Sequence, residues 1–354
     1  MIVRIMSKVS LVSQVIKHRI AHADDLLDGI PSERRFAIEL GVSRTTIRAA
    51  IENMLKSGIL AREPNGRLRV GHSAREQSQR TLGLVVPNGG ASEINLWRDG
   101  IMMALDGQPM TLRTVTYAHL ADASIADALA SFDGVFFVPQ TRDIPQWLLA
   151  QLQNSSKRVV VLDQDASADG LPSVVIFPPE SSRSLLDHLV ELGHRRIDCI
   201  ITQEDPDPSR GRAGYWQRYL AEKNLSGHLH ALMIGNPLQA GYQLIKDALA
   251  NGDALGTAFY CTSVWPAIGA MRALSEAGLE IGRDVSVCAV NDENLGRYLL
   301  KSLTALESPP RASCLRHPID WMLGEEKEWT GPLLICPEEV PLFKGESSGP
   351  APKE

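Results

Sequence analysis

Hydrophobic positions near the N-terminus repeat with the period of an α-helix. Over Val9–His22 the apolar residues Val12, Val15, Ile16 and Ile20 fall at i, i+3, i+4 and i+8, which places them on one face of a helix. The sequence therefore predicts a first amphipathic helix over this range.

A second helix is predicted after the loop that contains Asp28 and Gly29. Ser32 is a good N-cap because its side chain can accept a hydrogen bond from the first turn. The following apolar positions, Phe36, Ala37 and Leu40, would face the core, and Gly41 would end the helix in the left-handed conformation.

A third helix begins directly afterwards, with Ser43 as N-cap and Gly58 at its end. Two short helices joined by a glycine turn predict a helix-turn-helix. The inward stripe is Ile47, Ala50, Ile51, Met54 and Leu55, and the opposite face presents Arg44, Thr45 and Arg48 near the N-terminal end, where a recognition helix meets base edges.

Two short extended runs follow, Ile59–Glu63 and Arg67–Val70, on either side of Pro64-Asn65-Gly66. Asn-Gly between such runs predicts a β-hairpin. This hairpin would be the wing of a winged helix-turn-helix, with Arg62, Arg67 and Arg69 close to the DNA backbone.

Charge separates this N-terminal segment from the rest of the chain. Residues 1–72 contain 12 Lys and Arg against 7 Asp and Glu, a net charge of +5, although the whole chain has −6. A basic segment on an acidic protein is the electrostatic pattern expected of a DNA-binding head.

The residues from Pro31 to Arg48 resemble the DNA-binding head of the GntR family over Pro31-Ser32-Glu33-Arg34 and Leu40-Gly41-Val42-Ser43-Arg44-Thr45-Thr46-Ile47-Arg48. The resemblance implies that operator DNA is contacted by Arg34, Ser43, Arg44, Thr45, Thr46, Arg48 and Gly66. Arg35 departs from the acidic residue usual there, and the wing lacks the usual Gly-Thr-Phe ending. The alternative for Arg34 and Arg35 is surface pairing with Glu33 or Glu39.

From Leu82 onward, apolar strands alternate with helix-length amphipathic segments, which predicts parallel sheets covered on both faces. The expected strands are Leu82–Val86, Val135–Val138, Val159–Leu162, Val174–Ile176, Ile197–Ile201, Thr257–Tyr260 and Val285–Val290. The expected helices include Leu96–Leu105, Ile125–Phe132, Ser182–Leu192, Gln239–Ala250 and Ala267–Ala277. The length of this part of the chain, from Leu82 onward, favours an α/β fold of two lobes with a cleft between them.

This second part is similar to the effector domain of the LacI family, which has the fold of periplasmic sugar-binding proteins. The similarity is carried by Leu82–Pro87, Asp133–Val135, His188–Ile197, Ile268–Leu274, Asp284–Val287 and Leu303–Leu306. A GntR-type head on a LacI-type domain resembles the arrangement in arabinose-repressor-type regulators.

Ligands of such sheets bind at the carboxyl ends of the strands, so polar residues there are the effector-binding candidates. These are Asn88, Asp163, Ser263, Trp265 and Asn291. The resemblance implies a cleft arginine at Gly211, and both Arg210 and Arg212 flank that position. Ser263-Val264 and Asn291 differ from the family pattern, so the effector is not carried over. An ordinary helix-cap or loop role is the alternative for each residue.

Other chemistry is not indicated. No apolar run approaches the length of a membrane span, and no signal peptide is present, so we expect a cytoplasmic protein with no membrane partner. We expect buried thiols for the five cysteines, a chance match for Gly345-Glu346-Ser347-Ser348-Gly349, and a surface loop for His228 and His230. We predict no cofactor, no metal and no enzymatic activity.

The sequence thus predicts a winged helix-turn-helix over 1–71, a linker over 72–80, an effector-binding and dimerisation domain over 81–345, and a flexible tail over 346–354. The expected function is a homodimeric regulator of double-stranded operator DNA, with repression favoured over activation. A small-molecule effector, favoured as a sugar or sugar derivative, would control it. The alternative is a constitutive DNA-binding protein whose second domain only dimerises. Effector identity and operator sequence are open.

Overall fold

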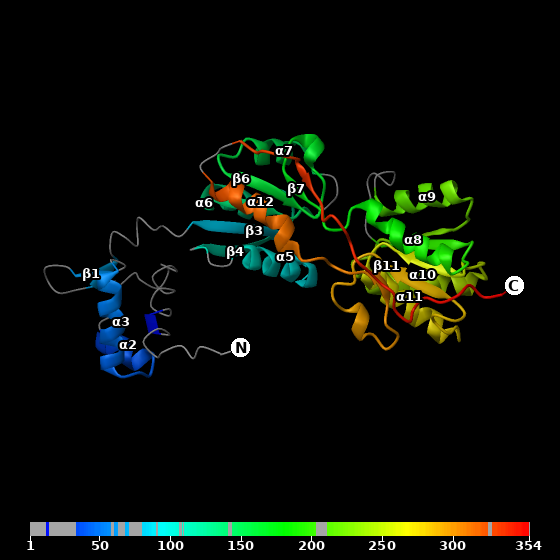
Figure 1. The fold of residues 1–354 in the computed structure, drawn as a ribbon, viewed down its shortest axis with the longest axis horizontal. Helices are drawn as coiled ribbons and strands as arrows, with labels where there is room; N and C mark the ends of the chain where they lie inside the picture. The colour runs from blue at the N-terminus through cyan, green and yellow to red at the C-terminus, as the bar shows by residue number, and fades with distance from the viewer. Residues whose placement is uncertain are drawn as a thin grey trace. The chain divides into compact units, whose positions relative to one another are not determined.

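The structure, a computed structural model, describes residues 12–13, 33–57, 60–62, 68–70, 80–89, 91–105, 108, 110–140, 144–202, 211–324 and 328–353 (Figure 1). The chain divides into two compact units, and the division falls between Arg80 and Thr81. The short segment Pro109–Thr111 groups with the first unit.

The described residues of the first unit include two helices and a hairpin in the predicted order. Helix α2 (Glu33–Glu39) is followed by a turn at Gly41, whose φ of +62° is the left-handed conformation predicted for it. Helix α3 (Arg44–Lys56) begins after Ser43, whose side chain accepts a hydrogen bond from the backbone N–H of Thr46. Both predictions at this turn are confirmed.

The hairpin pairs β1 (Leu60–Arg62) with β2 (Leu68–Val70) in antiparallel register, with Ala61 opposite Arg69. The predicted turn over 64–66, Gly58 and most of the predicted first helix lie outside the described residues. The core of the unit consists of Val12, Phe36, Ile47, Ala50, Ile51, Met54 and Leu60. The inward stripe expected for α3 is therefore confirmed, with Leu55 at its margin.

The second unit has two lobes, each built on a six-stranded sheet. The sheet of lobe 1 has the order β13-β7-β6-β5-β3-β4. Its strands are β3 (Thr81–Pro87), β4 (Thr111–Tyr117), β5 (Gly134–Phe137), β6 (Arg158–Leu162), β7 (Ser173–Val174) and β13 (Leu334–Ile335). Its helices are α5 (Ala91–Ala104), α6 (Ala123–Ser131), α7 (Gln146–Gln153) and α12 (Arg311–Leu323).

The sheet of lobe 2 has the order β14-β12-β11-β10-β8-β9. Its strands are β8 (Ile197–Ile201), β9 (Leu229–Ala231), β10 (Ala258–Cys261), β11 (Ser286–Ala289), β12 (Thr304–Leu306) and β14 (Leu342–Phe343). Its helices are α8 (Ser182–Glu191), α9 (Arg212–Lys223), α10 (Pro237–Asn251) and α11 (Val264–Glu276). The predicted α/β fold with two parallel-sheet lobes is confirmed.

The chain passes from one lobe to the other after β7, after β12 and again after β13 (Figure 1). Strand β13 joins the edge of lobe 1 beside β7, and β14 returns to lobe 2, where it pairs antiparallel with β12. Helix α12 packs on α5 through Gly100, where a Cβ atom would lie 2.8 Å from that of Arg311. Neither lobe is therefore a continuous stretch of sequence.

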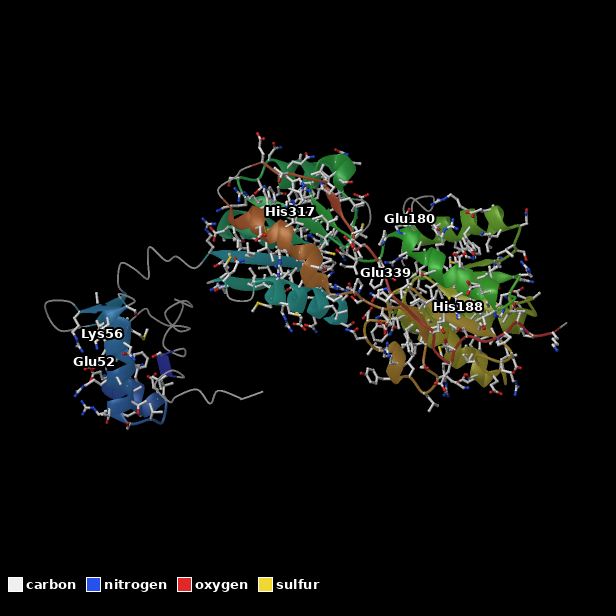
Figure 2. All side chains as sticks on the ribbon, viewed as in Figure 1. Glu52, Lys56, Glu180, His188, His317 and Glu339 are labelled. Atoms are coloured by element: carbon white, nitrogen blue, oxygen red, sulfur yellow. The ribbon has the colours of Figure 1, made fainter. Side chains whose placement is uncertain are left out.

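The segment after β14 differs from the flexible tail expected over 346–354. Ser347 is fully buried in lobe 2, where its hydroxyl donates to Val287 O and accepts from the backbone N–H of Thr304. Ser348 hydrogen-bonds His188 on α8, 2.9 Å away, and Figure 2 shows His188 on that helix. Buried backbone groups of lobe 2 form hydrogen bonds with this segment, and for this reason the segment packs against the lobe.

The surface loop expected around His228 and His230 holds for His228, which is exposed just before β9, but is wrong for His230. His230 lies on β9 with 7% of its surface exposed, and its imidazole is 3.1 Å from the carboxylate of Asp198. Asp198 is itself completely buried and also accepts hydrogen bonds from the backbone N–H groups of His228 and Gly256. The pair thus belongs to a buried polar network that supports the β8–β9 edge.

Candidate functional site

Helix α3 carries the polar surface of the first unit. Its buried stripe fixes the helix on the core, and Ser43, Arg44, Thr45 and Arg48 lie on the exposed side. The capping hydroxyl of Ser43 also lies 2.8 Å from the hydroxyl of Thr46. The side chains of these two predicted DNA-contact residues therefore hydrogen-bond each other at the start of α3. Backbone N–H groups at a helix N-terminus favour an anion such as phosphate.

Glu33 links this surface to the hairpin. Its carboxylate accepts from Arg48 at 3.2 Å and from Arg62 at 3.3 Å, whereas Arg35 pairs with Glu39 at 2.9 Å on the same helix. Surface pairing is therefore what the structure shows for Arg35. Arg34 lies in α2, but its side chain, Gly66 and Arg67 are outside the described residues.

In the second unit, two of the predicted effector residues come together with a residue that sequence analysis missed. Trp265 donates its indole N–H to Glu293 at 2.9 Å, and the backbone N–H of Glu293 donates to the side-chain oxygen of Asn291 at 3.1 Å. Asn291 and Glu293 have φ values of +58° and +46°. A glutamate rarely adopts this left-handed conformation, so the loop after β11 is shaped by its contacts.

These side chains of lobe 2 also bond to lobe 1. Asn291 donates to Glu93 at 2.9 Å, and the Ser92 hydroxyl donates to Glu293. Glu93 is held in turn by Arg311 at 2.7 Å, the first residue of α12. We call these six residues, Ser92, Glu93, Trp265, Asn291, Glu293 and Arg311, the interlobe cluster.

Arg311 is the buried charge of the interlobe cluster. Only 3% of its side chain is exposed, its guanidinium carbon lies 4.4 Å from the ring centroid of Trp97, and Nη1 has no hydrogen-bond partner among the described residues. A buried cation requires a partner, and the carboxylate of Glu93 and the face of Trp97 supply it. Arg311 therefore ties the end of an interlobe crossing to α5.

Glu293 is the second carboxylate of the interlobe cluster. Burial raises the pKa of Glu293 above its usual value, and the nearby charge of Glu93 raises it further, although the hydrogen bond from Ser92 opposes the rise. Both carboxylates are thus satisfied by donors from the protein itself. A bound ligand would have to exchange with these donors or add to them.

Arg212 lies at the start of α9, where the resemblance placed a cleft arginine. Its guanidinium donates to the carbonyl of Thr262, just after β10, at 2.9 Å and to that of Phe177, in the first crossing, at 3.3 Å. Arg212 therefore braces the connection between the lobes. Arg210 is outside the described residues.

The remaining candidates lie at strand ends but are not joined to the interlobe cluster by the hydrogen bonds found within the described ranges. Asn88, after β3, and Asp163, after β6, are both exposed, and Asp163 has a φ of +63°. Ser263 precedes α11 without capping it through its side chain. The structure therefore leaves the predicted effector role of these three residues as a prediction.

Sequence analysis missed Ser92, Glu93, Glu293 and Arg311. Ser92 and Glu93 stand in the first turn of the helix after β3, which is a strand end of the kind already searched. The sequence around Arg311 does not indicate its role in this cluster, because its partner Glu93 is 218 positions away in the sequence.

Comparison with known proteins agrees with this architecture. The sequence profile of the periplasmic binding protein-like domain matches residues 186–316. Solved structures align over much more of the chain. The Lac repressor bound to ONPG covers 86% of this chain and 90% of its own, with a TM-score of 0.66 and 19% identity. The two lobes have the periplasmic-binding-protein-like fold.

A LacI family transcriptional regulator from Enterococcus faecium with bound ribose aligns with a TM-score of 0.64 and 20% identity, over 77% of this chain and 99% of its own. Among curated proteins, the HTH-type transcriptional regulator GalR of Streptococcus thermophilus is 29% identical over 163 residues, 45% of this chain and 49% of that protein. The HTH-type transcriptional repressor MelR of Bacillus subtilis is 27% identical over 183 residues, 49% of this chain and 52% of that protein.

The chain therefore spans about half the length of the curated relatives it matches. The names of these relatives do not refer to the GntR family, so the resemblance of the first unit to GntR heads stays a prediction. No helix in the described ranges is long and apolar enough to cross a membrane.

Proposed function

We propose that this protein is a transcription regulator that binds double-stranded operator DNA through its first unit and a small molecule through its second. The observation that carries the proposal is the surface of α3. A capped helix holds Arg44, Thr45 and Arg48 outward from its N-terminal half, and an arginine-bearing hairpin follows it. Recognition helices present side chains to DNA bases in this way.

The finer parts of the proposal are a GntR-type winged head, a homodimer and repression. Relatives of the chain include a protein named as a repressor, and solved structures of similar fold include a dimeric Lac repressor. A two-fold dimer would place two heads on the two halves of a pseudo-palindromic operator.

For the effector we propose a sugar or sugar derivative that binds at the strand ends facing the interlobe cluster. Ribose is bound in one structure of similar fold and glucose in another. The interlobe cluster supplies carboxylate, amide and indole groups, which suit hydroxyls and the apolar face of a sugar ring. Effector binding would change the balance of interlobe contacts only if it favours one lobe arrangement over the other.

One observation favours a second candidate, a constitutive DNA-binding protein whose second unit serves only for dimerisation. The carboxylates of Glu93 and Glu293 are already bonded to protein donors without any ligand. In this case ribose, glucose and sucrose would change neither the melting temperature nor the affinity for DNA.

The proposal is tested by selection of DNA from a randomised 40-base-pair duplex library with the full-length protein. Enrichment of a defined, pseudo-palindromic sequence is the expected result. If no sequence is enriched and the protein does not shift random duplex DNA at low salt, the proposed DNA-binding function is wrong. Addition of ribose, glucose or sucrose to the selected complex then separates the two candidates.

A further inference from the structure

Glu33 is placed differently from Glu39, the other acidic residue of α2. It is the first residue of α2, yet its carboxylate bonds to two arginines from two other elements, Arg48 of α3 and Arg62 of β1. The side chain of Glu33 is only 18% exposed, whereas those of Arg48 and Arg62 are 59% and 47% exposed. The carboxylate thus sits beneath two cations that face solvent.

The two arginines belong to the parts of the unit that would approach DNA. Arg48 is one turn into α3, and Arg62 ends the first strand of the hairpin. Glu33 therefore offsets part of the positive charge that these two arginines present. Such a pair attracts any phosphate backbone regardless of sequence, since nonspecific binding comes from cations that replace counterions.

The contacts to Glu33 are long enough to be exchanged. All three N–O distances are 3.2–3.3 Å, and ion pairs between partly exposed side chains are weak. A guanidinium in such a pair can leave the carboxylate when a better acceptor is offered in the right place. The N7 and O6 atoms of guanine are acceptors of this kind for arginine.

We propose that Glu33 is a specificity-determining residue of the DNA-binding unit. It neutralises part of the charge of Arg48 and Arg62 in the free protein, and so lowers affinity for random DNA, while it holds both side chains near the geometry used at the operator. This inference rests on the proposed DNA-binding function. It concerns Glu33 through its contacts to the two arginines.

The test compares Glu33→Gln with Glu39→Gln in the full-length protein. Both variants remove one negative charge from α2 and keep the shape of the side chain, but Glu39 pairs with Arg35 of the same helix. The probes are a labelled 30-base-pair duplex of random sequence and a duplex carrying the sequence that the wild-type protein enriches from a randomised library. Affinity is measured by fluorescence anisotropy at several salt concentrations.

Glu33→Gln is expected to bind the random duplex about three- to tenfold more tightly than wild type at low salt. The slope of log K against log salt should steepen by about 0.9 for each further phosphate that a released arginine contacts. Affinity for the enriched sequence should rise less, so that the ratio of the two affinities falls. Glu39→Gln should keep the wild-type ratio.

Equal behaviour of Glu33→Gln and Glu39→Gln on both duplexes would overturn the inference while leaving the DNA-binding function intact. A wild-type protein that enriches no sequence would instead overturn the function itself. Circular dichroism checks that each variant is folded. If Glu33→Gln unfolds the unit, Glu33→Ser is the second variant, because serine is well tolerated at a helix start.

Discussion

The side-chain amide of Asn291 donates a hydrogen bond of 2.9 Å to the carboxylate of Glu93 and so joins the loop after β11 in lobe 2 to the first turn of α5 in lobe 1. The other oxygen of that carboxylate is bound to Arg311. One glutamate therefore connects both lobes to the end of an interlobe crossing. Removal of this glutamate should therefore lower the stability of the whole second unit.

Replacement of Glu93 with alanine is expected to destabilise the second unit by about 3 kcal/mol, because it leaves the charge of Arg311 buried without its carboxylate. Urea unfolding followed by tryptophan fluorescence measures the loss. Glu339→Ala, which removes an exposed glutamate of the same unit (Figure 2), is the control and should change the midpoint little. A similar midpoint for both variants would show that the pair carries no net stability.

The burial of Glu293 predicts that the stability of the second unit depends on pH. Its pKa is raised, so the folded protein holds this proton more tightly than the unfolded chain does. The contribution of Glu293 to stability is then largest at acidic pH and is lost as the pH rises through the raised pKa. Glu293→Gln mimics the neutral form, so its melting temperature should rise relative to that of wild type as the pH increases above the ordinary glutamate pKa of about 4.

Glu180→Gln, at an exposed position of the same unit, is the matched control for this measurement (Figure 2). The difference in melting temperature between Glu180→Gln and wild type should stay constant over the same pH range. A constant difference for Glu293→Gln as well would mean that Glu293 has the same pKa in the folded and unfolded states.

Arg48 is expected to read DNA. Arg48→Ala should weaken binding to the enriched operator by about 1 to 3 kcal/mol, and the loss should depend on the base at one position of the sequence. Lys56, on the last turn of α3 (Figure 2), provides the comparison. Lys56→Ala should change binding less and equally for all sequences. Unchanged operator binding by Arg48→Ala in a gel-shift titration would remove α3 as the recognition helix.

Asp163 tests the effector site. Asp163→Ala should leave operator binding intact and abolish the response to whichever of ribose, glucose or sucrose raises the melting temperature of the wild-type protein. Asp163 is exposed at the end of β6, so its replacement should not unfold lobe 1. A variant that still responds to the sugar would place the binding site elsewhere.

Ser347 tests the packing of the segment after β14. Ser347→Ala leaves the N–H of Thr304 and the carbonyl of Val287 without their buried partner, which should cost about 2 kcal/mol. Thermal unfolding measures the effect, and Ser275→Ala on the exposed side of α11 is the control. Equal melting temperatures for the two variants would contradict a structural role for this segment.

Local pattern predicted most of the elements that are regular and strongly apolar. Strand β8 was predicted with its observed ends, Ile197 and Ile201, because all its side chains are buried. Strand β7 proved shorter than the predicted Val174–Ile176, and it starts at Ser173. The capped turn at Gly41 and Ser43 was predictable because its chemistry lies within a few residues.

Other elements could not be predicted from local pattern. Strand β4 is only partly buried, and its sequence Thr-Leu-Arg-Thr-Val-Thr-Tyr mixes polar and apolar residues at a sheet edge. Helix α12 contains Pro318, which argues against a helix in sequence analysis. Trp265 and Asn291 were found as polar strand-end residues. Glu93 and Glu293 also follow strand ends, but their hydrogen bonds to Asn291 and Trp265 join segments distant in the sequence and were recognisable only in the folded structure.

The crossings of the chain between the lobes also bear on how the protein is made. Lobe 1 lacks its edge strand until β13 is synthesised, and lobe 2 lacks β14 and the buried Ser347 until still later. Domains usually fold as units while the ribosome adds residues in order. Here neither lobe can finish before the other has begun, so the nascent second unit must hold two incomplete sheets at once.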